Sequence, residues 1–147
     1  MTSSPVTTDN ATTVADIYAA FGRGDVPAIL RVLADDVAWE DWPDNFAQRA
    51  GVPDMTARHG RADVGNFFAL VGNWTVLDFA VVDVIGTGRQ VAAEVRLSFA
   101  VPGGGRFIDE EIHLWTFDAD GLVTRLRHYT DTAKHIAAAR GEDTTVR

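Results

Sequence analysis

The chain has 147 residues, 46% of them apolar and none of them cysteine, and its 13 Lys and Arg against 21 Asp and Glu give a formal net charge of −8. This length is typical of a single domain with a core large enough to fold without a metal or a disulfide. The lack of cysteine excludes disulfides, thiolate nucleophiles and cysteine-ligated zinc sites. Because the net negative charge repels phosphates, we expect neither a nucleic acid nor a membrane surface as a partner.

The first residues, MTSSPVTTDNATT, lack the basic and apolar regions of a signal peptide. No apolar run approaches the roughly 20 residues that a membrane helix needs. We therefore expect a soluble, cytoplasmic protein. Both ends of the chain are polar, which predicts a flexible N-terminal segment (1–10), a single domain (11–140) and a flexible tail (141–147).

Helices are predicted from apolar residues that recur at spacings of three and four. This pattern covers 12–21 and again 61–71. Between these two segments, Asp25 is expected to cap a short second helix. Near the end of the chain, Asp131 is expected to cap a short last helix over about 132–139.

A first strand is predicted within 37–42, and it is followed by a polar segment, 43–57, which fits either a loop or a short helix. From residue 76 the chain is rich in β-branched and aromatic residues, with turn signals between the runs. Three helices followed by a strand meander predict an α+β fold, with the helices on one face of a curved, mostly antiparallel sheet and a pocket between the two layers. The strands of the meander are predicted at 76–85, 89–101, 106–117 and 122–131.

The turn at 118–121 determines which side chains share a face of the sheet. If this turn is a four-residue loop, Phe117 pairs with Leu122. In that register His113 lies opposite Leu126, and Glu111 lies opposite His128. The inner face then carries Asp109, Glu111, His113, Trp115, Leu126, His128 and Thr130.

The neighbouring strand adds one of two sets to this face, depending on whether the Gly103–Gly105 turn carries a bulge. We favour the apolar set, because it leaves the charged side chains to pair on the outer face. The interior is then mostly apolar and holds His113 and His128, with Glu111 and Asp109 nearer its rim. Titratable groups in such surroundings are candidate acids and bases. The apolar set is Val91, Val95, Leu97 and Phe99, and the alternative is Glu94, Arg96 and Ser98.

Five segments of the chain resemble a known family. They are AAFGRGD at 19–25, LADDVAWED at 33–41, RHGR at 58–61, LWTFDADG at 114–121 and HYTDT at 128–132. In order and spacing they resemble the ketosteroid isomerase-like and SnoaL-like branch of the nuclear transport factor two (NTF2-like) superfamily, over about 12–139. The resemblance implies the NTF2-like cone. This superfold hosts isomerases, cyclases, dehydratases, epoxide hydrolases and non-catalytic binding modules.

The resemblance also implies roles for individual residues. Asp41 matches the base with which ketosteroid isomerases move a proton next to a carbonyl. The tyrosine of their oxyanion hole falls on Ile17, with Tyr18 one residue away, and their second acid falls on His113. The aspartate that epoxide hydrolases of this superfamily use is replaced by His128, which leaves His128 as an acid or base.

These residues predict an enzyme that needs no cofactor and performs general acid/base chemistry on a small hydrophobic carbonyl compound, polyketide-like or steroid-like, by isomerisation, cyclisation or dehydration. Asp41 would take the proton, and His113 or His128 would polarise the carbonyl or return the proton. No metal is expected, because the spacing of the acids and histidines matches no metal-site motif. The residues expected to bind substrate are Tyr18, Trp39, Trp42, Phe68, Leu97, Phe99, Glu111, Trp115 and Leu126.

The alternative to an enzyme is a non-catalytic module that uses the same cone to bind a small molecule or to dimerise. By analogy with the family, we also expect a homodimer that forms through the outer face of the sheet.

Overall fold

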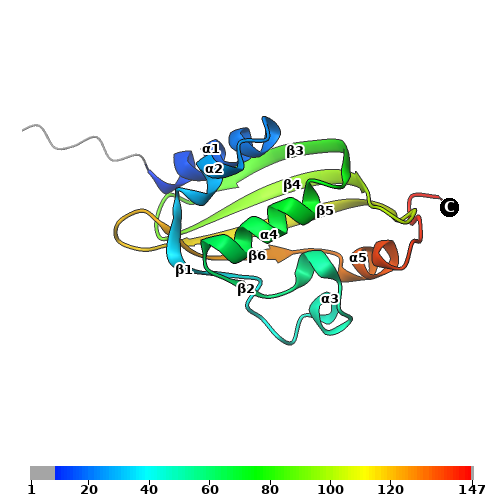
Figure 1. Cartoon of the computed structure of the whole chain (residues 1–147). Helices are drawn as coiled ribbons and strands as arrows, with labels where there is room; N and C mark the ends of the chain where they lie inside the picture. The colour runs from blue at the N-terminus through cyan, green and yellow to red at the C-terminus, as the bar shows by residue number, and fades with distance from the viewer. Residues whose placement is uncertain (1–8, 147) are drawn as a thin grey trace, which may run out of the picture.

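A computed structural model describes residues 9–146, so residues 1–8 of the predicted flexible segment lie outside the described part. The described residues form an α+β fold with one mixed sheet of six strands, in the order β2-β1-β6-β5-β4-β3 (Figure 1). None of its helices is long and apolar enough to cross a membrane. In chain order the elements are α1 (Asn10–Gly22), α2 (Val26–Leu30), β1 (Leu33–Trp39), α3 (Phe46–Arg49), the 3-10 helix η1 (Pro53–Met55), β2 (Arg58–His59), α4 (Arg61–Val71), β3 (Thr75–Ile85), β4 (Gln90–Ala100), β5 (Arg106–Phe117), β6 (Val123–Tyr129) and α5 (Thr132–Ala139).

The helices α1, α2 and α3 begin at side-chain caps, which are Asp9, Asp25 and Asn45. Asp25 accepts a hydrogen bond from Ala28 N at 3.2 Å and so starts α2 as predicted. Asp131 occupies the cap position of α5 without a side-chain cap bond, and its backbone N–H instead donates to the carboxylate of Asp109 at 3.2 Å. The predicted boundaries of α4 and α5 are confirmed.

The first strand differs from its prediction. β1 ends at Trp39 rather than at residue 42, because Glu40 adopts a positive φ of 59° and turns the chain. β1 runs parallel to β6 and antiparallel to β2, which makes the sheet mixed. The polar segment that the sequence left open, 43–57, forms α3 and η1.

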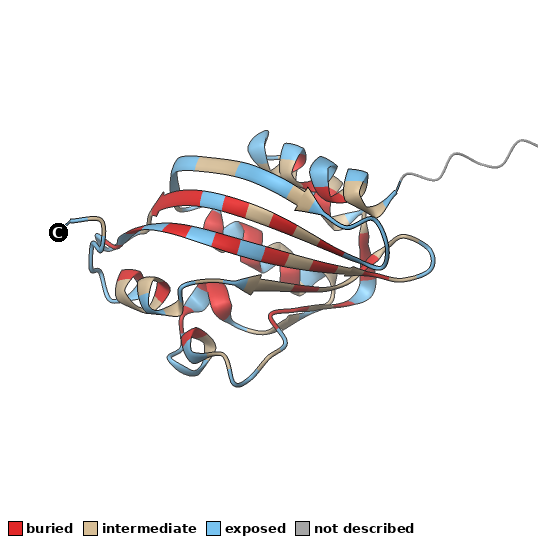
Figure 2. Ribbon diagram, turned by 180° about the vertical axis from the view of Figure 1, so that it is seen from behind, coloured by how far each residue is buried: buried red, intermediate tan, exposed pale blue. Residues whose placement is uncertain are grey.

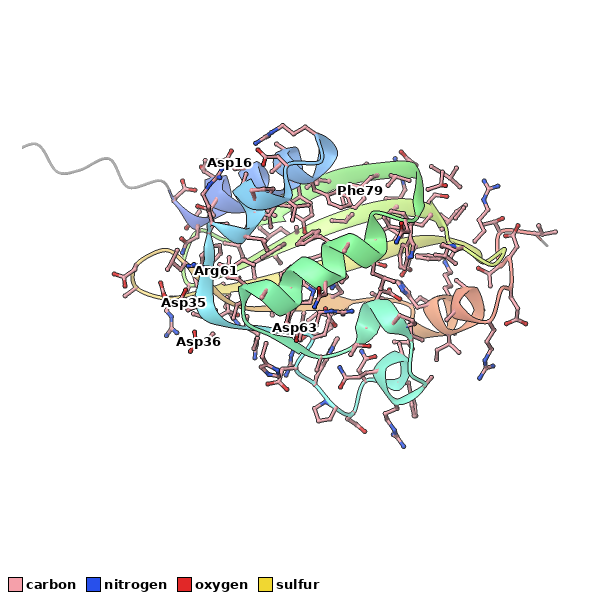
Figure 3. The ribbon with its side chains drawn as sticks, in the orientation of Figure 1. Asp16, Asp35, Asp36, Arg61, Asp63 and Phe79 are labelled. Carbon is pink, nitrogen blue, oxygen red and sulfur yellow. The ribbon has the colours of Figure 1, made fainter. Side chains whose placement is uncertain are left out.

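The helices α1, α2 and α4 lie over one face of the sheet (Figure 1). Arg61 fixes the start of α4 to β1, since it donates to Leu33 O at 2.8 Å and lies 3.0 Å from the Asp35 carboxylate (Figure 3). The strands β4 and β5 alternate between buried and more exposed residues (Figure 2), as expected of a sheet with one covered face. Val95 and Leu97 are buried, so the apolar set of β4 faces inward as predicted.

The register between β5 and β6 is shifted from the prediction. His113 pairs with His128 and Trp115 pairs with Leu126, a shift of two residues. One residue of the shift arises at the turn, where Phe117 pairs with Val123 rather than with Leu122, and the other arises from an irregularity between Thr116 and Phe117. The shift preserves the face of each residue. It places the two imidazole rings directly opposite each other, with their centroids 4.3 Å apart.

The tail predicted to be flexible is hydrogen-bonded in part to the start of β5. Arg106 N donates to Glu142 O at 3.2 Å, and Thr144 N donates to Arg106 O at 3.1 Å. These two bonds hold residues 142 and 144 of the tail against β5.

Candidate active site

A cavity of about 670 Å³, including its open mouth, lies between α1, α4 and the inner face of the sheet. Most of its wall is aromatic or aliphatic; for example, Phe79 of β3 packs against Phe21 of α1 with ring centroids 5.2 Å apart (Figure 3). This lining suits a small, mostly apolar molecule. Nine of the residues singled out from the sequence line the cavity: Tyr18, Trp39, Phe68, Leu97, Phe99, Glu111, His113, Trp115 and His128.

Three residues singled out from the sequence do not line the cavity. Asp41 lies outside it, with a side chain that is 52% exposed and 3.6 Å from His59. Trp42 packs on Tyr129 with ring centroids 4.7 Å apart, and Leu126 is fully buried in the core without bordering the cavity.

The placement of Asp41 has a local cause. Strand alternation puts Val37 and Trp39 inward and predicts the same for Asp41. The positive φ of Glu40 breaks this alternation, so Glu40 is fully buried while Asp41 is exposed. A non-glycine residue in this conformation stores strain, which is often found at functional sites.

Glu40 holds His128. Its Oε1 atom accepts hydrogen bonds from the backbone N–H of His128 at 2.8 Å and from the imidazole Nδ1 at 2.5 Å. Its Oε2 atom accepts a third from Trp42 Nε1 at 3.0 Å. These bonds fix the orientation of the His128 ring and place a proton on Nδ1.

The second nitrogen of His128, Nε2, has no hydrogen-bond partner among residues 9–146, and His128 lines the cavity. Burial lowers the pKa of His128, but the charge of Glu40 and its hydrogen bond outweigh burial and raise the pKa above its ordinary value. The raised pKa favours the protonated ring, so a proton taken up at Nε2 is stabilised.

His113 is held differently. Its Nε2 atom donates to Glu111 at 2.8 Å, and its Nδ1 atom accepts from the Tyr18 hydroxyl at 2.6 Å. The Tyr18 oxygen in turn accepts from Trp115 Nε1 at 3.2 Å. Burial and the neighbouring His128 lower the pKa of His113, which keeps its ring neutral. Burial also raises the pKa of Tyr18, so the hydroxyl keeps its proton.

A third histidine, His135 of α5, joins the site and was not predicted from the sequence. Its Nδ1 atom donates to Asp54 at 3.0 Å, and its Nε2 atom lies 2.9 Å from Glu111 and 3.1 Å from Asp109. Burial lowers the pKa of His135, but its bonds to Asp109, Asp54 and Glu111 raise it well above the ordinary value. His135 is therefore an imidazolium that neutralises the carboxylates around it.

The pKa values of Glu111 and Asp109 are shifted in opposite directions. Burial raises the pKa of Glu111, but hydrogen bonds from His113 and His135 outweigh it and hold the pKa well below the ordinary value. Burial and the nearby Glu111 raise the pKa of Asp109. Glu111 is thus the charged link between the two histidines, and it is buried in the cluster rather than at the rim where the sequence suggested.

Asp109, Glu111 and His135 are also the group in the described part of the chain that could hold a metal ion, since one ligand atom from each lies within 4.8 Å of the others. In this structure the same atoms are satisfied by one another, because His135 donates to both carboxylates. The geometry is that of a proton-bridged cluster.

Two residues of the cavity wall carry buried polar atoms that have no partner among residues 9–146. They are the indole Nε1 of Trp39 and the hydroxyl of Thr130. Buried polar groups almost always have a hydrogen-bond partner. Both atoms are therefore candidate contacts for a polar group of a ligand.

Signals for the missed residues were weak. His135 lies in a correctly predicted helix, on the buried face that it shares with Ala138. Asp54 lies in η1, within the segment 43–57 for which the sequence pattern predicted no definite element. Glu40 was inside the recognised Trp39-Glu40-Asp41 sequence, and only its backbone conformation distinguishes it from Asp41.

Comparison with known proteins agrees with this fold. The sequence matches the family model of the SnoaL-like domain over residues 14–126, so the chain belongs to the SnoaL-like family. A comparison with curated proteins found no match.

Among solved structures, an NTF2-like protein of unknown function from Burkholderia pseudomallei has a TM-score of 0.74 at 25% identity, over 90% of this chain and 98% of that chain. A putative isomerase from Rhodopseudomonas palustris has a TM-score of 0.67 at 20% identity, over 93% and 100%. A protein from Mycobacterium tuberculosis in complex with estradiol-17beta-hemisuccinate has a TM-score of 0.63 at 21% identity, over 83% and 94%. The fold is thus NTF2-like, as the sequence suggested.

Proposed function

We propose that this chain is a general acid/base enzyme that needs no cofactor and acts on a small hydrophobic carbonyl compound in the cavity. The observation that carries the proposal is the Glu40–His128 pair, in which a buried carboxylate orients an imidazole that lines the cavity and whose Nε2 atom has no hydrogen-bond partner among residues 9–146. A carboxylate that fixes the tautomer of a catalytic histidine is a recurring arrangement in enzymes. His128 takes the role that the sequence gave to Asp41.

The chemistry starts with neutral His128. Its Nε2 atom takes a proton from the carbon next to the carbonyl of the substrate, and the electron pair of the broken C–H bond forms the enolate. The imidazolium that results is stabilised by Glu40. It returns the proton to another carbon in an isomerisation, or gives it to a departing hydroxyl in a dehydration.

The developing enolate oxygen needs a hydrogen-bond donor. The Trp39 N–H has no protein acceptor among residues 9–146, and we assign this role to it. His113 already uses both ring nitrogens, to Tyr18 and Glu111, so we assign it the positioning of Tyr18 rather than proton transfer.

The substrate class follows from the wall of the cavity. Aromatic and aliphatic side chains favour a flat apolar ring compound, and exclusion of water strengthens each polar contact inside. The structural neighbours support this class, because one is described as a putative isomerase and one was solved with a steroid derivative.

The test is a thermal-shift screen with cyclic enones, steroids and aromatic polyketides, followed by an assay of the compounds that bind. Wild type and His128→Gln should bind the same compound, and only wild type should convert it. His59→Gln is the matched control, because His59 is an exposed histidine outside the cavity. Binding by wild type without conversion of any compound would favour the non-catalytic binding module.

We also propose that the protein forms a homodimer through the outer face of the sheet. Ile108 and Ile112 of β5 point to that face with 48% and 36% exposure, and Tyr129 of β6, which pairs with Ile112, is 41% exposed. Figure 2 views the molecule from this side. An apolar set of this kind on a sheet face is a common site of association.

A further inference from the structure

A second hollow lies beside the cavity, at the end of the molecule where α5 meets the turn between β4 and β5 (Figure 1). Its volume is about 670 Å³, including its open mouth. The C-terminal end of α4 and the helix η1 complete its wall. The wall is mainly apolar, with Trp74, Phe107 and Ala138 among its residues, and its polar residues are Asp54, Asn73 and His135.

The shape of this end depends on a close approach of α5 to the turn. A Cβ atom at Gly105 would lie 2.1 Å from the carbonyl oxygen of Ala138, so only glycine allows the helix to pack here. The packing is part of the fold, because Ala138 is buried and belongs to the core. The second hollow is therefore a built feature rather than a gap in a loose surface.

The cavity and the second hollow share part of their walls. Asp54, Trp74, Phe107 and His135 line both. Asp54 and His135 are hydrogen-bonded to each other, so they present a neutralised pair at the boundary. The rings of Trp74 and Phe107 lie 6.3 Å apart and form the apolar part of this partition. Phe107 is fully buried, whereas Trp74 is only partly buried at the edge of the core.

The reacting end lies far from the apolar part of this partition, Trp74 and Phe107. The polar part lies nearer, because Glu111 is hydrogen-bonded to both His113 and His135. His113, which pairs with His128, and Phe107 are six residues apart on β5. At a rise of about 3.4 Å per residue, this separation is about 20 Å along the strand. A compact ring held at His128 therefore ends before the rings of Phe107 and Trp74, and only an extended molecule reaches them.

We infer that the second hollow is a subsite for an aliphatic tail, so that the substrate is an elongated compound with a polar ring at His128 and an unbranched apolar chain that passes Trp74. The inference rests on the proposed function only for the position of the ring. An apolar tail suits the wall, because each methylene that is removed from water lowers the free energy of binding. The polar groups at the boundary, Asp54 and His135, are already hydrogen-bonded to each other and need no partner from the ligand.

The experiment measures the affinity of cyclic enones that carry n-alkyl chains from ethyl to dodecyl, by titration calorimetry. Burial of each methylene should tighten binding by about fourfold, and the gain should continue through the longest chains. Ala139→Trp fills the second hollow from an exposed position of α5 and should remove the gain for long chains while leaving the ethyl compound unaffected.

The matched control is Ala133→Trp, an exposed position on the same helix outside the second hollow, which should bind every compound as wild type does. Asn73→Trp fills the second hollow from its opposite wall and should reproduce Ala139→Trp, which covers the case in which one variant fails to fold. An affinity that stops rising at intermediate chains, or long chains that bind both filled variants as tightly as wild type, would overturn the inference.

The readout separates this inference from the proposed function. Chain-length dependence that is lost in Ala139→Trp, without conversion of any compound, would support the subsite and contradict the enzyme. Conversion of short enones with no chain-length gain would support the enzyme and contradict the subsite.

Discussion

Glu40 and His128 are 88 residues apart in the chain, yet one carboxylate oxygen of Glu40 accepts both the backbone N–H and the ring Nδ1–H of His128. β1 and β6 are parallel neighbours, and the turn of the chain at Glu40 brings the carboxylate under the histidine. The pair thus depends on the one parallel contact of the described sheet and on one strained residue.

Glu40→Gln should preserve the shape of this pair and remove its charge. Because the charge of Glu40 raises the pKa of His128, its loss should move the acidic limb of the pH–rate profile to lower pH. Loss of a group that orients a functional histidine typically costs about 10- to 100-fold in activity. Steady-state assays across pH 4 to 9 check both effects.

Asp41→Asn is the matched control for this variant. Asp41 is exposed and outside the cavity, so its loss should leave the rate and the profile unchanged. A large loss of activity in Asp41→Asn, with Glu40→Gln like wild type, would restore the assignment made from the sequence.

His135 should make stability depend on pH. Its pKa is raised in the folded protein, so its contribution is fully present below the unfolded value of 6.5 and is lost as pH rises through the folded value. Above about pH 6.5 the free energy of unfolding should fall by about 1.4 kcal/mol per pH unit from this group. Urea denaturation between pH 6 and 9 measures the slope.

The variant His135→Gln should be less stable by about 3 to 5 kcal/mol at pH 6, because it leaves buried carboxylates without their cation. It should also lack the part of the pH slope that His135 provides. A slope equal to that of wild type would show that His135 is not the group that titrates.

Tyr18→Phe should cost about 1 to 3 kcal/mol of stability, because it leaves both His113 Nδ1 and Trp115 Nε1 buried without a partner. Tyr129→Phe removes a hydroxyl from the exposed outer face and should leave stability unchanged. Denaturation of the two variants under one condition makes the comparison. An equal loss of stability in Tyr18→Phe and Tyr129→Phe would mean that the Tyr18 hydroxyl does not stabilise the rings of His113 and Trp115.

Ile112→Lys should convert the proposed dimer to a monomer, because it places a charge among the exposed apolar side chains of Ile108 and Tyr129 on the outer face. Sedimentation should give about twice the chain mass of 15.9 kDa for wild type and a single chain mass for the variant. Wild type that sediments as a single chain at micromolar concentration would contradict the dimer.

The sequence predicted the fold well where the pattern was long. The helix at 61–71 and the strands of the meander were placed to within a few residues, because strong periodicity and turn residues mark them. The inward set of β4 was also predicted, because only one choice buries apolar residues and leaves charges outside.

The site was predicted less well, for three physical reasons. A longer turn and an irregularity after Thr116 together moved the β5–β6 register, and neither has a distinct residue pattern. The positive φ of Glu40 exchanged the roles of two adjacent acids. The Asp54–His135 contact joins residues 81 apart, which only the tertiary structure brings together.

The most direct test of the account is hydrogen–deuterium exchange on a bound cyclic enone in heavy water, followed by NMR at the carbon next to the carbonyl. It requires no knowledge of the full reaction, because isomerisation, cyclisation and dehydration all begin with removal of this proton. The account predicts exchange with wild type and with Asp41→Asn, and at most the uncatalysed rate with His128→Gln. Equal exchange with wild type and His128→Gln, or loss of exchange in Asp41→Asn alone, would contradict it.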